Sequence, residues 1–150
     1  MRNLPSDVSS LTAAIIGSAI TVHQETGAGL LESVYKLCLA AELRARGFRV
    51  EPECILPLIY RDVRLESAYR ADMIVEKSVL IEVKAVENLL PLHQAQVITY
   101  LKMSGCPIGL LLNFNVPILR HGIRRMLHPA LRHGLPEPMA DAVRGPRNAD

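Results

Sequence analysis

The spacing of apolar and polar positions changes along the chain, and the changes predict its helices and strands. Helical spacing in the first third predicts two helices. One begins at Ser6 or Asp7 and runs toward Glu25, and the other spans residues 30–46 before Gly47 ends it. Shorter β-branched and apolar runs follow, separated by prolines and polar turns. We expect strands at residues 48–50, 55–60, 63–69, 73–76 and 79–86.

The helical spacing returns over residues 92–103, which Gly105 and Pro107 bring to an end. An unbroken apolar run then predicts a strand at 108–114, and residues 118–127 fit either a short strand or a helix. Two helices, a meander of strands, a helix and a final strand predict an α/β fold, with a mixed central β-sheet flanked by helices. We expect one domain over residues 1–133 and a loose C-terminal tail over 134–150, where Pro, Gly, Asp and Arg dominate.

The composition is that of a globular protein, with 49% hydrophobic and 21% charged residues in 150. No apolar run approaches the roughly 20 residues that a bilayer span needs, and the first ten residues do not resemble a secretory signal. We therefore expect a cytoplasmic protein with no membrane partner. The three cysteines lack the close pairing of a zinc site and predict reduced thiols.

A net charge of +2 neither indicates nor excludes a nucleic-acid partner. The positive charge is concentrated late in the chain, where residues 119–134 carry cations and no acid. Arg120, Arg124 and Arg125 in this segment could contact phosphates, or they could form an ordinary solvated basic face.

Asp72, Glu82 and Lys84 stand within two otherwise apolar strand segments. Side chains alternate along a strand, so Glu82 and Lys84 share one face, about 7 Å apart. If residues 76–78 form the hairpin loop, Val75 pairs with Val79 and Asp72 lies opposite Glu82 on the same face. A loop of two residues would place the carboxylates on opposite faces, so the hairpin register decides whether a site exists.

Two carboxylates placed side by side repel each other, and their burial is unfavourable without a counter-charge. A divalent cation between Asp72 and Glu82 would offset the repulsion, and magnesium suits carboxylate ligands and retained waters. The alternative is a structural ion pair of Lys84 with Glu82 or Asp72, which needs no metal.

Two helical segments carry further polar side chains at helical spacing. Glu32 and Tyr35 face the same side as Leu39, so Glu32 should point toward the protein, although an ordinary surface glutamate would fit as well. Gln96 and Tyr100 also share one face. They could touch a phosphate or position a water, or simply belong to a half-exposed amphipathic helix.

Several motifs together resemble the GxxExxY protein family, a branch of the PD-(D/E)XK nuclease superfamily. They are GLLESVY at 29–35, YRADMIVE at 69–76, IEVKAV at 81–86, HQAQVITYL at 93–101 and GLLLNFN at 109–115. The resemblance implies a restriction-endonuclease-like core. By motif position it implies metal ligands at Asp72 and Glu82, a helix-borne acid at Glu32 completing the metal site, and a catalytic lysine at Lys84.

The resemblance also implies substrate contacts. Gln96 and Tyr100 resemble a QxxxY helix of exonuclease-like members, and we include Tyr35 with them as a predicted substrate-binding residue. The chain departs from the superfamily motif at Ala71, where the motif name has proline.

Three functions remain open from the sequence. The first is a nuclease dependent on Mg (or Mn) that hydrolyses phosphodiester bonds in nucleic acid. The second is a catalytically silent nuclease-fold module that binds a partner protein or forms a homodimer. The third is a metal-dependent hydrolase of another phosphoester. Four acidic and lysine positions standing together favour the first.

Overall fold

The computed structural model describes residues 6–133, so the predicted tail at 134–150 lies outside the described residues. The elements in chain order are α1 Ser6–Thr26, α2 Glu32–Ala45, β1 Val50–Tyr60, β2 Val63–Val75, β3 Val79–Lys84, α3 Pro91–Ser104, β4 Ile108–Asn113, the 3₁₀ turn η1 Leu119–Gly122, β5 Ile123–Leu127 and α4 Pro129–His133.

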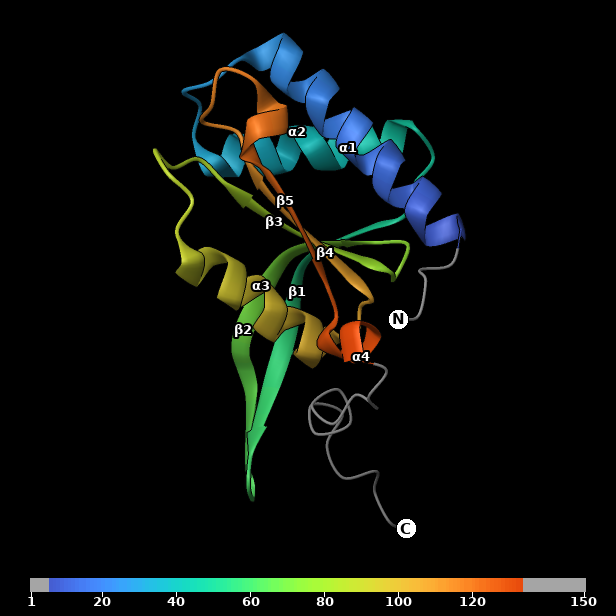
Figure 1. The fold of residues 1–150 in the computed structure, drawn as a ribbon, viewed down its shortest axis with the longest axis vertical. Helices are drawn as coiled ribbons and strands as arrows, with labels where there is room; N and C mark the ends of the chain where they lie inside the picture. The colour runs from blue at the N-terminus through green and yellow to red at the C-terminus, as the bar shows by residue number, and fades with distance from the viewer. Residues whose placement is uncertain (1–5, 134–150) are drawn as a thin grey trace.

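The five strands form one sheet in the order β1-β2-β3-β4-β5. Strands β3 and β4 pair in parallel, and every other neighbouring pair is antiparallel. The predicted α/β fold, a mixed central sheet flanked by helices, is therefore confirmed. Figure 1 shows α1 and α2 against one face of this sheet and α3 against the other.

Successive side chains of β3 point to opposite faces of the sheet and pack into two separate apolar cores. Val79, Ile81 and Val83 join the core beneath α1 and α2, whereas Leu80 packs with Val97 and other residues beneath α3. Because Glu82 and Lys84 have the parity of Leu80, they belong to the α3 face of the sheet. Parallel strands need a long crossover connection, and α3 makes this connection between β3 and β4.

The hairpin of β1 and β2 is longer than the sequence predicted. We expected several short strands separated at the prolines, but β1 runs unbroken from Val50 to Tyr60 and β2 from Val63 to Val75. Pro52 and Pro57 fit because β1 is an edge strand, where one side of the backbone needs no partner. The register shifts once, between Leu56 and Leu58. The outer part of the hairpin projects well beyond the helices (Figure 1).

Close packing of α3 on the sheet depends on a glycine. A Cβ at Gly109 of β4 would lie 2.6 Å from Val97 Cγ1, so only the missing side chain lets α3 sit this low. The ambiguous segment 118–127 contains both of its predicted alternatives, since η1 precedes β5. No helix among residues 6–133 combines the length and apolarity needed to cross a bilayer.

Candidate active site

The β2–β3 hairpin has the register that a three-residue loop at 76–78 predicts. Val75 pairs with Val79 and Met73 with Ile81, and the loop is Glu76-Lys77-Ser78. Glu76 and Lys77 take positive φ angles of 50° and 56°, which lets the three-residue loop turn tightly. Cα pairing stops at Met73 and Ile81, one residue short of the two acids.

Beyond that point the acids connect the two strands through their side chains. The Asp72 backbone N–H donates a hydrogen bond to Glu82 Oε1 at 2.9 Å, and the Val83 N–H donates one to Asp72 Oδ2 at 2.8 Å. Each carboxylate therefore accepts a backbone proton from the opposite strand. The two side chains are fixed close together between strands whose ladder has ended.

The charged form of Glu82 is disfavoured chiefly by burial and next by the neighbouring acids. Its side chain is only 4% exposed. Burial is the main cause that raises the pKa of Glu82 to about 8, and the Asp72 carboxylate is the second. Glu32 raises this pKa further, while the hydrogen bond from Asp72 N–H and the charge of Lys84 lower it. Glu82 thus senses all three other members of the predicted catalytic set.

Glu32 and Lys84 approach this cluster from different elements. Glu32 is the first residue of α2, Lys84 is the last residue of β3, and both are half-buried. Within residues 6–133 no ion pair joins Lys84 to Glu82 or Asp72, so the structural ion pair considered from the sequence is not formed there.

A second lysine, Lys36, which the sequence reasoning missed, forms an ion pair with Asp72. Lys36 Nζ lies 3.3 Å from Asp72 Oδ1 and 3.3 Å from Glu53 Oε1. Burial lowers the pKa of Lys36, but the two carboxylates outweigh it and the net shift is upward. Lys36 follows Glu32 by four residues, so the helical spacing that directed Glu32 inward also carried the signal for Lys36.

The helix α3 brings Tyr100 to the same cluster, and Gln96 of the same helix contacts Tyr100. Tyr100 is 5% exposed, and its pKa is raised by burial and next by the Glu82 carboxylate. Gln96 Nε2 donates to the Tyr100 hydroxyl oxygen at 2.9 Å, and the Tyr69 ring lies 5.6 Å from the Tyr100 ring. The two predicted side chains are therefore coupled to each other, and Tyr100 is close enough to Glu82 to sense its charge.

Tyr35 is placed differently from its predicted role at the substrate. Its side chain is fully buried and stacks on Phe114 at a centroid distance of 4.5 Å. Its hydroxyl donates to Gly27 O at 2.5 Å and accepts from Leu30 N–H at 3.1 Å. These contacts make Tyr35 a support for the 27–30 loop that leads into Glu32, and a direct contact with substrate stays a prediction.

The donor set suits a cation that takes few protein ligands. Residues 6–133 contain no group of three or more His, Cys, Asp and Glu placed to enclose a metal ion. Asp72 and Glu82 instead offer two adjacent carboxylates beside the charge of Glu32. Magnesium is commonly bound through one or two carboxylates, with its remaining positions filled by water and substrate phosphate. The site fits that pattern and does not fit an enclosed metal cage.

The fold and this site define a class of protein: α/β proteins with an Asp on one strand and a Glu-x-Lys motif on the strand beside it. A family model described as the PD-(D/E)XK nuclease superfamily matches residues 9–126, from α1 through most of β5. The chain belongs to the PD-(D/E)XK nuclease superfamily, whose members generally use divalent metals. Searches of curated proteins and of solved structures gave no match. Membership of the GxxExxY branch stays a prediction.

Proposed function

We propose that this protein is a metal-dependent nuclease that hydrolyses phosphodiester bonds in nucleic acid. The observation that carries the proposal is a pair of hydrogen bonds between the two strands, from Asp72 N–H to Glu82 Oε1 and from Val83 N–H to Asp72 Oδ2, with Lys84 on the same face of β3. Such an arrangement keeps two carboxylates together despite their repulsion, which folding alone does not require. The superfamily match supports the same chemistry.

Asp72 and Glu82 would hold a Mg²⁺ or Mn²⁺ ion, with Glu32 assisting through water. A bound divalent ion would supply positive charge to a phosphate oxygen and lower the pKa of a coordinated water. Lys84 would orient the attacking water or stabilise the negative charge that grows on the phosphate oxygens. Gln96, held by Tyr100, would position the substrate or a water. Hydrolysis joins the water oxygen to phosphorus and breaks one P–O ester bond, and the departing oxygen takes a proton.

The direct test is cleavage by purified protein. Supercoiled plasmid, linear duplex DNA, single-stranded DNA and RNA are incubated with Mg²⁺, Mn²⁺ or EDTA, alongside a small phosphodiester. We expect metal-dependent cleavage of at least one nucleic acid and a loss of at least about 100-fold in Lys84→Ala. Lys102→Ala, which removes another half-buried lysine from α3, is the matched control and should keep wild-type activity.

Equal cleavage by Lys84→Ala and the wild type would assign the activity to a contaminant or to another site. Cleavage of the small diester alone would identify a hydrolase of another phosphoester.

One observation favours a second candidate, a nuclease-fold binding module that turns over nothing. The Lys36 ammonium already neutralises part of the Asp72 charge, as an internal ion pair would in a site without a metal. If this candidate is right, the protein cleaves nothing with either metal. It instead binds a protein partner or a second copy of the chain in solution. The homodimer and the cytoplasmic location stay predictions.

A further inference from the structure

The arginines near the C-terminal end of the fold divide between the two faces of the sheet. Leu111 of β4 pairs with Arg124 of β5 on one side and with Glu82 of β3 on the other. Paired residues of neighbouring strands point to the same face. Glu82, Leu111 and Arg124 therefore form one row on the α3 face. At about 4.8 Å per strand spacing, the Arg124 backbone lies roughly 10 Å from that of Glu82.

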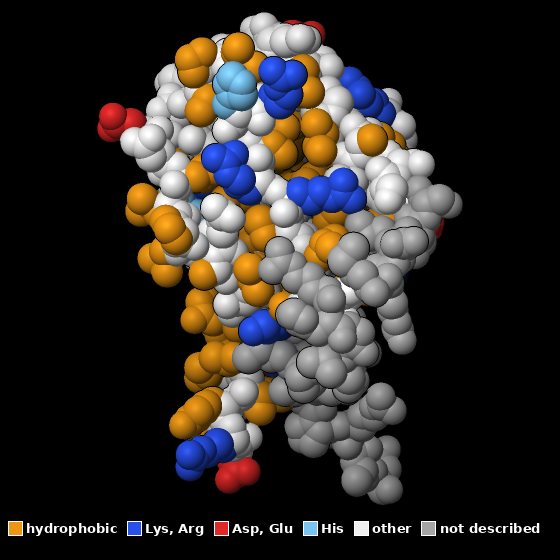
Figure 2. Space-filling view, in the orientation of Figure 1, with side chains coloured by type: hydrophobic (Ala, Val, Ile, Leu, Met, Phe, Trp, Pro, Cys, Tyr) orange, Lys and Arg blue, Asp and Glu red, His pale blue; other side chains and the backbone are white. Residues whose placement is uncertain are grey.

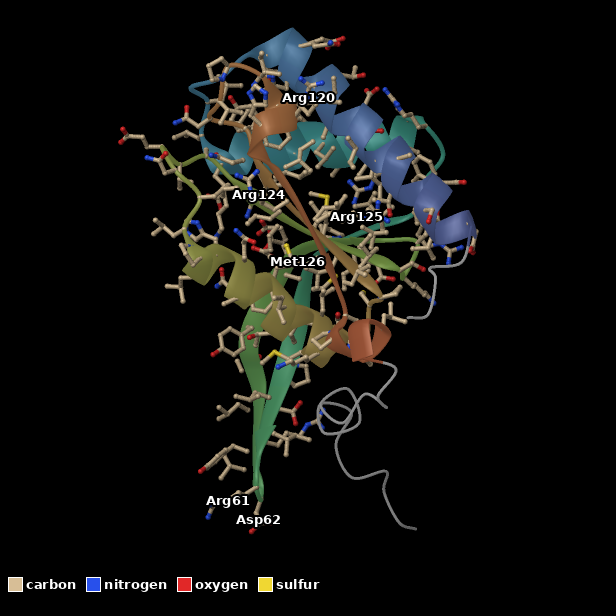
Figure 3. The ribbon with its side chains drawn as sticks, in the orientation of Figure 1. Arg61, Asp62, Arg120, Arg124, Arg125 and Met126 are labelled. Atoms are coloured by element: carbon tan, nitrogen blue, oxygen red, sulfur yellow. The ribbon has the colours of Figure 1, made fainter. Side chains whose placement is uncertain are left out.

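Arg125, the next residue, belongs to the opposite face. Its neighbours of the same parity, Ile123 and Leu127, pack against the core beneath α1 and α2. Figure 3 shows the Arg124 and Arg125 side chains leaving β5 on opposite sides, with Arg125 on the α1 side. Arg120 lies on η1, close to the helices of that same layer (Figure 3). Arg124 is thus the one member of this group of three that belongs to the face of the acidic cluster.

The Arg124 guanidinium is exposed and held by backbone alone. Its Nη1 donates to the His121 and Ile123 carbonyl oxygens, at 3.0 Å each. Among residues 6–133 no carboxylate forms an ion pair with it, whereas Arg46 and Arg64 are paired with glutamates. The guanidinium is oriented before any ligand arrives, and it keeps N–H donors available. Figure 2 shows the Lys and Arg side chains of this region on a face that carries few acidic groups.

We propose that Arg124 binds a phosphate of the nucleic-acid strand whose cleavage the acidic cluster carries out, and that Arg125 does not. The inference rests on the proposed function. If the substrate is a nucleic acid, the acidic cluster alone would repel it, and a positive side chain on the same face would offset that repulsion. A guanidinium donates to phosphate oxygens in a fixed fork, which suits a contact that sets the register of the strand.

The test compares Arg124→Ala with Arg125→Ala, a pair that removes the same charge from neighbouring positions on opposite faces. Binding of labelled duplex DNA and of its single strand is measured in EDTA over a range of KCl concentrations. Arg124→Ala should weaken binding on the order of tenfold and reduce the log–log salt slope by about 0.9 for the duplex or about 0.7 for the single strand. Arg124→Lys should restore the slope, and Arg125→Ala should leave it unchanged.

Equal effects of the two alanine variants, or none in Arg124→Ala, would overturn the inference, as would a wild-type protein that binds neither probe. Thermal unfolding of each variant excludes misfolding as the cause of a loss. The proposed function is judged separately, by cleavage and its loss in Lys84→Ala. If the wild type cuts nucleic acid and Arg124→Ala has the same kcat/KM, the function stands and only the role of Arg124 fails.

Discussion

Replacing Glu82 by glutamine should change how the stability of the protein depends on pH. The folded protein raises the pKa of Glu82 to about 8 from an ordinary value of 4.5, chiefly through burial and the nearby Asp72. The native state therefore binds more protons than the unfolded chain between these values, and stability falls as pH rises through that window. Below pH 4.5 the penalty is absent, and above pH 8 it is fully present.

The magnitude follows from the two pKa values. At 1.36 kcal/mol per pH unit, a pKa of about 8 against 4.5 corresponds to about 5 kcal/mol in all. About 4 kcal/mol of this develops between pH 5 and pH 8.5. Glutamine replaces the carboxyl oxygen that accepts the Asp72 N–H proton by an amide oxygen that can accept it too, and glutamine carries no charge. Glu82→Gln should therefore lack this loss and be more stable than the wild type at pH 8.5.

The assay is urea unfolding in EDTA at several pH values from 5 to 8.5, for the wild type, Glu82→Gln and Glu87→Gln. Glu87 is exposed, so its variant controls for the loss of one negative charge. Added Mg²⁺ should stabilise the wild type more at high pH than at low pH. It should stabilise Glu82→Gln less than the wild type. Parallel pH profiles for the wild type and Glu82→Gln would refute the reasoning, because they would show that the buried carboxyl is not protonated in the folded state.

Two further substitutions test the supports of the site. Lys36→Met should lower the unfolding free energy in EDTA by about 1–3 kcal/mol, since the partly buried Asp72 carboxylate loses its hydrogen-bonded ion-pair partner. Urea unfolding measures this, and an unchanged midpoint would contradict it. Tyr35→Phe keeps the stacked ring but leaves two backbone groups without their hydroxyl partner. We expect a loss of about 1–3 kcal/mol, with cleavage retained at temperatures where the variant stays folded. If Tyr35→Phe lost cleavage without losing stability, the result would indicate that Tyr35 contacts the substrate.

The parts of the fold that follow from local pattern were predictable. The three long helices and the buried strands β3 and β4 appear where spacing placed them, within a few residues. The β2–β3 register depended on the loop length: the observed three-residue loop 76–78 places Asp72 and Glu82 on one face, whereas the two-residue alternative would have separated them. The length of the β1–β2 hairpin did not follow, because proline signals a break unless the strand is known to lie at an edge.

The site was predictable only in part, for a similar reason. Alternation along β3 gave Glu82 and Lys84 a common face, but no pattern in the strands revealed that the ladder ends at Met73. Lys36 was missed because a lysine on a helix is normally solvated, and its contacts come from Glu53 and Asp72 on two other elements. The contacts of Tyr35 with the 27–30 loop were not predictable, because the sequence motif that contains it does not separate residues that contact substrate from residues that hold the loop.

The end of the β2–β3 ladder explains why such an unfavourable arrangement of acids persists. When two strands part, the next backbone N–H groups lose their carbonyl acceptors, and an unpaired buried N–H is expensive. Here the Asp72 and Val83 amides recover acceptors from the Glu82 and Asp72 carboxylates. Both acids are thereby fixed by the fold itself. Neutral isosteres such as asparagine or glutamine could supply the same acceptors without mutual repulsion. Folding therefore does not require carboxylates at these positions, which supports the proposed role of Asp72 and Glu82 in binding a cation.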